Sequence, residues 1–226
     1  MGSAETGTED SSGSVQPESE SPRRARRMAS GDVIRDAAAA LFLENGYQGT
    51  SMDDIAAAAR ISKQTIYTHF ADKEALFRDL VLGNASRVDE FAQNLVRAVR
   101  DAPDVRTALR DLGRQYIRIV TRPDVLRLRR LVIAESGRFP DISRAYYEQV
   151  PERMYVALAD LMRELSGRGA LRLDDPEQTS RQFAWLVLGV PMDRGMFLGA
   201  DDPLPDAELD RIADAGVTVF LAAYGG

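Results

Sequence analysis

Helical spacing of apolar residues constrains the fold of this chain more than any other feature. Beyond Arg27, apolar side chains recur three or four positions apart, in segments dominated by Ala, Leu, Arg and Glu. No stretch shows sustained alternation of β-branched residues, which is the pattern of a half-buried strand. Pro and Gly residues interrupt the pattern at helical lengths. The sequence therefore predicts an all-α protein.

The composition excludes several classes of function. Cysteine is absent and histidine occurs only at His69, so the chain lacks the residues for disulfides, thiol nucleophiles and Cys-based or multi-His metal centres. We therefore expect no metal site and no cofactor. No apolar run approaches the roughly 18 residues that a membrane span needs, and the N-terminus does not have the pattern of a signal peptide. These features favour a cytoplasmic protein without a membrane partner.

The net charge of −6 is concentrated in one segment. Residues 1–22 hold five acids and no base in a background of Ser, Gly, Thr and Pro, which predicts a disordered acidic tail. Residues 23–82 carry a net charge of +1, and they begin with a basic arm at Arg23, Arg24, Arg26 and Arg27. This arm either follows DNA phosphates or is a solvated linker. The acidity of the whole chain is thus weak evidence against DNA binding.

Three helices are predicted between residues 33 and 70. The first covers residues 33–43 and ends at Asn45-Gly46. Ser51 and Ser62 are N-cap residues for the second, at 52–59, and the third, at 63–70. Short helices joined by a tight turn, with small alanines at the crossing, have helix-turn-helix geometry. A fourth helix is expected to run from residue 73 to residue 100.

The exposed face of the third predicted helix carries the chemistry. When Ile66 and Phe70 face the core, Gln64 and Thr68 point away from it. A Gln amide can form two hydrogen bonds to adenine, and hydroxyl groups bind phosphate oxygens. The alternative is an ordinary solvated face, but such faces usually carry Glu and Lys. The residue types on this face therefore favour DNA binding over a merely solvated surface.

Several segments between residues 34 and 77 match a known pattern: IRDAA at 34–38, NGY at 45–47, GTSM at 49–52, ISKQTIYTHF at 61–70 and KEALF at 73–77. Together they resemble the DNA-binding domain of the TetR/AcrR transcriptional regulators. The resemblance implies a homodimeric, ligand-responsive repressor. Its DNA-binding domain would cover residues 23–72, and a helical regulatory and dimerisation domain would cover residues 73–226, with the helix at 73–100 connecting the two.

The resemblance also implies which residues meet DNA. Phosphate contacts fall to Thr50, Ser51, Tyr67, His69 and Lys73. Base contacts fall to Lys63, Gln64, Thr65 and Thr68. Arg60 departs from the pattern, because the family often has Gly there, and a non-Gly residue in the left-handed conformation costs about 1 kcal/mol. A catalytic role for His69 is the weaker alternative, because the chain has no second His to work with it.

A weaker resemblance continues beyond residue 100. The segments LRRLVIAE at 128–135, RFP at 138–140, YYE at 146–148 and GALR at 169–172 resemble the AefR-like class of TetR C-terminal domains. Aromatic and Met side chains concentrate between residues 116 and 197, and they suit an apolar pocket for a small-molecule effector. The candidate lining residues are Tyr116, Arg138, Tyr147, Met154, Phe183, Trp185 and Met192. The alternative is plain core, which is the more frequent role of such residues.

A dimer surface is expected on the last two predicted helices, at residues 176–198 and 205–223. In the second of these, apolar and small residues recur at i, i+3, i+4 and i+7, as close packing between subunits requires. The stripe consists of Leu209, Ile212, Ala213, Gly216, Phe220 and Ala223. The alternative is that this stripe belongs to the core of one subunit.

The sequence as a whole predicts a DNA-binding transcriptional regulator. We expect a repressor that binds a pseudo-palindromic operator as a dimer and is released by a small apolar or aromatic ligand. Two other classes stay open. A helical protein-interaction module would not bind DNA. An enzyme would need a convergent acid, base or nucleophile, which the sequence does not supply.

Overall fold

The structure is a computed structural model that describes residues 22–83, 85–199 and 202–226, with side chains for 30–83, 88–199 and 202–226. Within these residues the only pairing of the β type is one isolated bridge between Leu171 and Gly225. The predicted all-α class is confirmed. The predicted acidic tail, up to residue 21, and the side chains of the basic arm lie outside the described residues.

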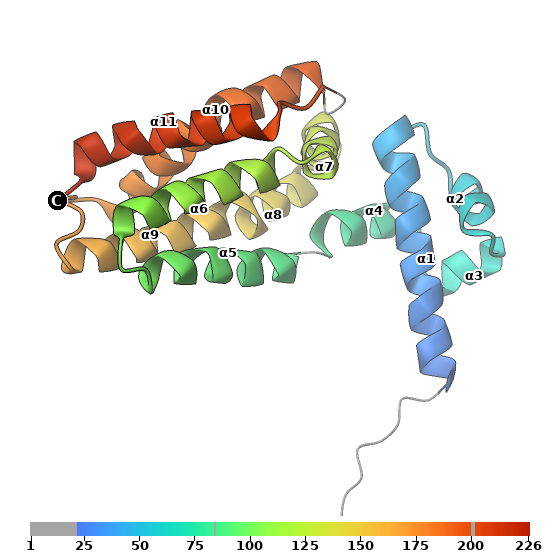
Figure 1. The fold of residues 1–226 in the computed structure, drawn as a ribbon. Coiled ribbons are helices and arrows are strands. Elements are labelled where there is room, and N and C mark those ends of the chain that lie inside the picture. The colour runs from blue at the N-terminus through green and yellow to red at the C-terminus, as the bar shows by residue number, and fades with distance from the viewer. Residues whose placement is uncertain (1–21, 84, 200–201) are drawn as a thin grey trace, which may run out of the picture.

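The helices form two groups, which Figure 1 shows side by side. The smaller group contains α1 (Pro22–Asn45), α2 (Met52–Ala59), α3 (Lys63–His69) and α4 (Lys73–Leu82). The larger group contains α5 (Ala85–Arg100), α6 (Val105–Val120), α7 (Pro123–Ala134), α8 (Pro140–Gln149), α9 (Pro151–Gly167), α10 (Pro176–Leu198) and α11 (Asp206–Tyr224). Within the described chain, none of these helices is long and apolar enough to cross a membrane.

Side-chain caps account for where the helices begin. At α2 the Ser51 hydroxyl accepts from the backbone N–H of Asp54 at 3.1 Å, and the Asp54 carboxylate accepts from the backbone N–H of Ser51 at 2.9 Å. This reciprocal pair is a capping box. At α3 and α4 the cap consists of one hydrogen bond only: the side chains of Ser62 and Asp72 accept from the backbone N–H groups of Thr65 and Ala75. Helices α7, α8 and α9 have no side-chain cap and begin with Pro, whose missing N–H costs nothing in the first turn. Helix α10 has both a Pro in its first turn and a side-chain cap from Asp175.

The prediction of one continuous helix from residue 73 to residue 100 is wrong. The structure divides this stretch into α4, which ends at a C-cap on Gly83, and α5, which starts at Ala85. Apolar periodicity continues through both helices, so the sequence pattern did not reveal the break. Pro151 does separate two helices, because α8 ends at Gln149 and α9 starts at Pro151.

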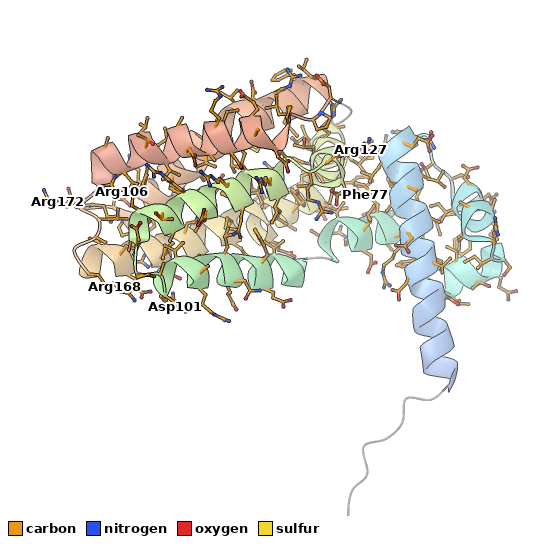
Figure 2. The ribbon with its side chains drawn as sticks, viewed as in Figure 1. Phe77, Asp101, Arg106, Arg127, Arg168 and Arg172 are labelled. Atoms are coloured by element: carbon orange, nitrogen blue, oxygen red, sulfur yellow. The ribbon has the colours of Figure 1, made fainter. Side chains whose placement is uncertain are left out.

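The first core joins the small helices to two helices of the larger group. Phe77 of α4, labelled in Figure 2, is 1% exposed and packs with Phe42 of α1 at a centroid distance of 5.6 Å. The same cluster of buried side chains includes Leu131 of α7, Ile142 of α8 and, between these helices, Phe139. Helices α7 and α8 are therefore the part of the larger group that rests on α1 and α4.

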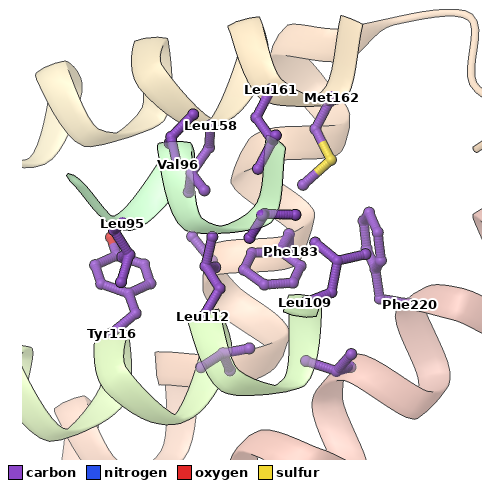
Figure 3. Close-up of a cluster of buried hydrophobic side chains, with 14 of the residues drawn as sticks. Leu95, Val96, Leu109, Leu112, Tyr116, Leu158, Leu161, Met162, Phe183 and Phe220 are labelled. Atoms are coloured by element: carbon purple, nitrogen blue, oxygen red, sulfur yellow. The ribbon is translucent and has the colours of Figure 1, made fainter. Parts of the chain in front are cut away.

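The second core fills the larger group. Its buried side chains come from α5, α6, α9, α10 and α11. Figure 3 shows Leu109 and Leu112 of α6 facing Leu158 and Leu161 of α9, with Phe183 of α10 between them. All of these side chains are at most 2% exposed, so this bundle supplies most of the apolar burial of the larger group.

Most of the stripe on α11 that was predicted to form the dimer surface lies inside the subunit, and only Ala223 at its end is exposed. Leu209, Ala213 and Phe220 are at most 6% exposed, and they pack against α6 and α10. A Cβ atom on Gly216 would lie 2.5 Å from the carbonyl oxygen of Leu186, so this glycine allows α11 to approach α10 closely. The alternative assignment to the core of one subunit is therefore correct.

Candidate DNA-binding and effector-binding sites

The turn between α2 and α3 positions the candidate recognition helix. Ile55 of α2 and Ile66 of α3 are fully buried and fix the two helices on the same core. Arg60, the C-cap of α2, has φ 55° and ψ 41°, and it is the only non-glycine residue with positive φ in the described chain. The left-handed conformation considered from the sequence is thus present, at a cost of about 1 kcal/mol.

The outer face of α3 is polar and open. Lys63, Gln64, Tyr67 and Thr68 are exposed, and the ring of Tyr67 is 46% exposed. In the described structure no hydrogen bond engages the Gln64 amide, so both its donor and its acceptor are available to a partner outside the chain. The predicted base-facing side of this helix is therefore presented to solvent.

The remaining base-contact candidates on this helix have internal partners. Lys63 pairs with Asp53 of α2 at 2.7 Å, with both side chains well exposed. The hydroxyl of Thr65 lies 2.8 Å from that of Ser62, and the hydroxyl of Thr68 donates to the carbonyl oxygen of Thr65 at 2.6 Å. An exposed ion pair is weakly held, so Lys63 remains available for exchange onto a stronger anion.

Two of the predicted phosphate contacts hold the segment between α1 and α2. Thr50 is 2% exposed, and its hydroxyl lies 2.9 Å from the carbonyl oxygen of Gly46. The Lys73 ammonium donates to the carbonyl oxygens of Tyr47 and Thr50 at 2.8 and 2.7 Å. It also lies 4.2 Å from the centroid of the Tyr47 ring. Burial lowers the pKa of Lys73, as expected for an ammonium enclosed by the fold.

Besides Tyr67 on the outer face of α3, the remaining two predicted phosphate contacts lie at helix ends. The Ser51 hydroxyl belongs to the capping box of α2, where it also donates to the Asp54 carboxylate at 2.6 Å. That hydrogen bond is the largest cause of the lowered pKa of Asp54. His69 is half-buried in the last turn of α3. Ser51 thus lies at the start of α2 and His69 at the end of α3.

The predicted effector residues separate into two places. Tyr116, Met154, Phe183 and Met192 are buried in the larger group, at most 6% exposed, whereas Tyr147 and Trp185 are 50% and 55% exposed. Arg138 lies elsewhere, with its guanidinium 5.8 Å from the Tyr47 ring centroid and 3.6 Å from the carboxylate of Glu135. Arg138 therefore belongs to the junction with the DNA-binding helices, so the structure does not place it with the other effector candidates.

Sequence reasoning missed the charged residues near this cluster. Arg129 of α7 donates to the Sδ atom of Met192 at 2.8 Å. Arg181 of α10 lies 4.8 Å from the ring centroid of Tyr155 and pairs with Glu152 at 2.6 Å. Arg129 is one of several arginines in a short run, and no sequence signal separates it from its neighbours. Among the described residues, no group of three or more Asp, Glu or His side chains is arranged to hold a metal ion.

Comparison with known families decides the identity. Residues 34–80 match the bacterial regulatory proteins of the tetR family. Residues 107–226, more than half of the chain, match the AefR-like transcriptional repressor C-terminal domain. The chain belongs to the TetR family. Because TetR-family proteins are transcription regulators, this one is a DNA-binding transcriptional regulator and not an enzyme.

Two solved structures resemble this TetR-family chain over most of its length. A TetR-family transcriptional regulator from Mesorhizobium loti is 39% identical with a TM-score of 0.82, over 89% of this chain and 99% of that chain. The Flavonoid-responsive Regulator FrrA is 36% identical with a TM-score of 0.66, over 88% of this chain and 98% of that chain.

A curated relative shares a shorter segment. The HTH-type negative transcriptional regulator IcaR of the biofilm operon icaADBC in Staphylococcus epidermidis is 44% identical over 50 residues. That segment is 22% of this TetR-family chain and 27% of IcaR, so the match covers about a quarter of the relative. IcaR from Staphylococcus aureus shows the same identity over the same length.

Replacement of Lys73 tests whether it holds the turn before α2. In Lys73→Met, the carbonyl oxygens of Tyr47 and Thr50 lose their donor, and we expect the free energy of unfolding to fall by about 1–3 kcal/mol. Thermal and denaturant unfolding measure the change. Lys63→Met is the matched control, because it removes only an exposed ion pair and should leave stability almost unchanged. Equal stability of the two variants would contradict the structural role of Lys73.

Proposed function

We propose that this TetR-family regulator is a homodimeric repressor that binds a pseudo-palindromic operator and is released by a small aromatic ligand. The observation that carries the DNA-binding half is the open polar face of α3, held by α2 across the Arg60 turn. Repression is supported by the family match to AefR-like repressors and by the relative IcaR, which is a negative regulator. As a regulator of transcription it would act in the cytoplasm.

The operator contacts follow from the chemistry of each side chain. Gln64 reads a base, because its unpaired amide can bond to the donor and acceptor of adenine together. Thr65, Thr68 and Lys63 approach neighbouring bases once Lys63 leaves Asp53. Contacts to phosphate come from the border of this face, namely from Thr50, Ser51, Tyr67, His69 and Lys73. Thr50 and Lys73 also form internal hydrogen bonds. They would therefore support phosphate binding by holding the turn before α2 in place as well as by direct contact.

The dimer forms through the outer faces of α10 and α11. Figure 1 shows these helices together on one side of the larger group, with α5 on the other. Their outer faces expose Val190 at 73%, Phe197 at 79% and Val219 at 56%, and clustered exposed apolar side chains mark interaction surfaces. A two-fold axis there presents two copies of α3 about one DNA turn apart, roughly 34 Å, as a palindromic operator requires.

The effector site lies in the larger group, between α6, α8, α9 and α10. Its proposed walls are Tyr116, Tyr147, Met154, Phe183, Trp185 and Met192. An aromatic effector is supported by these side chains and by FrrA, a similar protein that is named as flavonoid-responsive. Ligand and operator would oppose each other through one reciprocal coupling free energy.

Contacts at the α7–α8 turn give the effector site a route to DNA. The Phe139 ring packs on Tyr47 at a centroid distance of 4.8 Å, and Arg78 of α4 pairs with Asp141 of α8 at 2.5 Å. A ligand that shifts α8 would therefore move α4 and the turn before α2 together.

Replacement of Val190 tests the dimer surface. Val190→Glu puts a charge on an exposed position, so the subunit should fold normally, but the dimer should dissociate and operator affinity should fall steeply. Sedimentation velocity measures the oligomeric state. The control is Val156→Glu on α9, where the valine is also exposed, at 56%, but lies away from the proposed surface. A stable Val190→Glu dimer would place the interface elsewhere.

Replacement of Gln64 tests operator recognition. Gln64→Ala should relax the choice at one base pair in each half-site by about 1–3 kcal/mol, because only the amide contact is lost. Selection from random duplexes, with binding measured over a range of salt concentrations, provides the readout. Gln93→Ala, at an exposed Gln on α5, serves as the control. Uniform loss for all sequences would mean that Gln64 does not face bases, and affinity without salt dependence would favour the protein-interaction alternative.

A further inference from the structure

Arg129 carries a positive charge that nothing in the described chain neutralises. Its Nη1 atom donates to the weak acceptor Sδ of Met192 at 2.8 Å, and its Nε atom is buried without a hydrogen-bond partner. No carboxylate of the described residues lies within ion-pair distance of it. The neighbouring Arg181, by contrast, pairs with Glu152 at 2.6 Å. Of these two arginines, only Arg129 therefore has a positive charge without an ion-pair partner.

The side chains that meet Arg129 are a thioether and two phenols, and the other cation beside Tyr155, Arg181, is already paired with Glu152. Tyr116 of α6 and Tyr155 of α9 lie close enough for the guanidinium charge to act on both hydroxyls. Burial nevertheless raises the pKa of each, so both phenols are neutral at physiological pH. Trp185 of α10 and Tyr147 of α8 also lie near enough to the Tyr155 hydroxyl to affect its pKa. Neutral hydroxyls and aromatic walls thus surround an unpaired cation.

A buried N–H group without a partner is rare in native proteins, because it loses water and gains nothing in return. Nothing in the described chain supplies the acceptor that the Arg129 Nε–H group lacks. Nε and Nη of one guanidinium form a planar fork that fits an anionic oxygen. Because the walls are rings and a thioether rather than further cations, the rest of that ligand is flat and apolar.

We propose that Arg129 binds the ionised oxygen of an aromatic effector, a phenolate or a carboxylate, whose ring lies against Tyr155, Trp185 and Met192. This inference rests on the proposed effector function and names the ligand class of that site. Arg129 takes the orienting role for which the sequence had pointed to Arg138. A neutral ligand of the same shape leaves the guanidinium unpaired, and it binds more weakly.

A matched pair of probes tests this proposal. Quenching of Trp185, the only Trp of the chain, is titrated with 7-hydroxyflavone and with 7-methoxyflavone, which cannot ionise at that position. We expect the unmodified protein to bind the ionised hydroxyflavone at least about tenfold more tightly, as a charge-assisted hydrogen bond predicts. Arg129→Met should abolish this preference and melt at the same or a higher temperature, because an unpaired buried cation is replaced by an apolar chain. Arg130→Met, at the exposed neighbour on α7, should keep the preference.

A pH series on the unmodified protein gives a second readout that needs no variant to fold. Affinity for 7-hydroxyflavone should rise as its phenol ionises, while affinity for 7-methoxyflavone stays flat. Equal binding of the two probes, a preference that survives in Arg129→Met, or binding of neither probe overturns the role of Arg129. Operator release is followed in parallel. Release by both flavones without preference would keep the effector function and reject only the anionic class.

An independent observation concerns Arg60. Among residues 30–82 of the described chain, it is the one Lys or Arg whose side chain has neither an ion pair nor a hydrogen bond. Arg35 pairs with Asp32 and Asp79, and the lysines have the partners given above. Arg60 is exposed, yet its backbone is held in the left-handed region that glycine adopts without strain. A side chain at this position strains the backbone, and it forms no ion pair or hydrogen bond within the described chain.

We infer that Arg60 binds a phosphate of the duplex beside the groove that α3 enters. Arg60 is the C-cap of α2 and precedes Lys63, the first residue of the recognition helix, by three positions, so it lies at the turn that leads into that helix. A free guanidinium at this turn gains a partner when DNA binds. This inference rests on the proposed DNA binding.

Arg60→Gly separates this role from a structural one, because its two effects have opposite signs. The melting temperature should rise as strain is relieved. Operator affinity should fall for all sequences alike, and the slope of log affinity against log salt should shrink by about 0.9, the value for one phosphate contact. Arg97→Ala, an exposed Arg on α5, controls for net charge and should leave the slope unchanged. If Arg60→Gly keeps the slope of the unmodified protein, Arg60 makes no phosphate contact, and DNA binding itself stands.

Discussion

The packing of Phe139 on Tyr47 and Phe77 is the contact on which the arrangement of this molecule depends. The centroid distances are 4.8 Å to Tyr47 and 5.5 Å to Phe77, so one ring from the α7–α8 turn touches both the end of α1 and the middle of α4. Aromatic groups at these distances contribute more than their buried area alone. Because Tyr47 also accepts from Lys73 through its carbonyl oxygen, the same cluster fixes where the segment before α2 lies.

The cations of the small helices show how an acidic chain can bind DNA. Arg35 and Arg78 are paired with carboxylates, and Lys73 is enclosed by carbonyl oxygens. The face that α3 presents is therefore polar rather than strongly positive. Recognition by such a face relies on the directional hydrogen bonds of Gln and hydroxyl groups, which read sequence, more than on net charge, which attracts any duplex.

The larger group combines a well-packed apolar bundle with one polar cluster at its edge. Phe183 and Phe220 pack edge to face at a centroid distance of 5.1 Å and need no partner. Arg129, a few residues before the α7–α8 turn, has an N–H group that does need one. Arg129 lies on α7, the helix that leads to Phe139. The proposed effector contact and the contact to the DNA-binding helices therefore lie on one segment of the chain.

The sequence by itself determined the elements. Apolar period and capping residues predicted the helical class, the helix-turn-helix, the starts at Ser51 and Ser62, and the bounds of α10. These depend on neighbours within a few positions, so the local pattern contains the information. The open polar face of α3 followed for the same reason, because Ile66 and Phe70, four positions apart, both face the core.

Only the tertiary structure decided what covers each face. Leu209 and Gly216 mark the apolar side of α11 in the sequence, but the periodicity does not say whether α10 or a second subunit lies against it. In the sequence, Lys73 looks like an exposed lysine that is free to bind phosphate. In the structure its ammonium donates to the carbonyl oxygens of Tyr47 and Thr50, more than twenty positions earlier. No sequence pattern distinguishes the role of Arg129 from that of Arg138. Packing places Arg129 beside Met192 and Arg138 beside Tyr47. Periodicity reports the direction of a side chain relative to its own helix, whereas its partner is set by which helices meet in space.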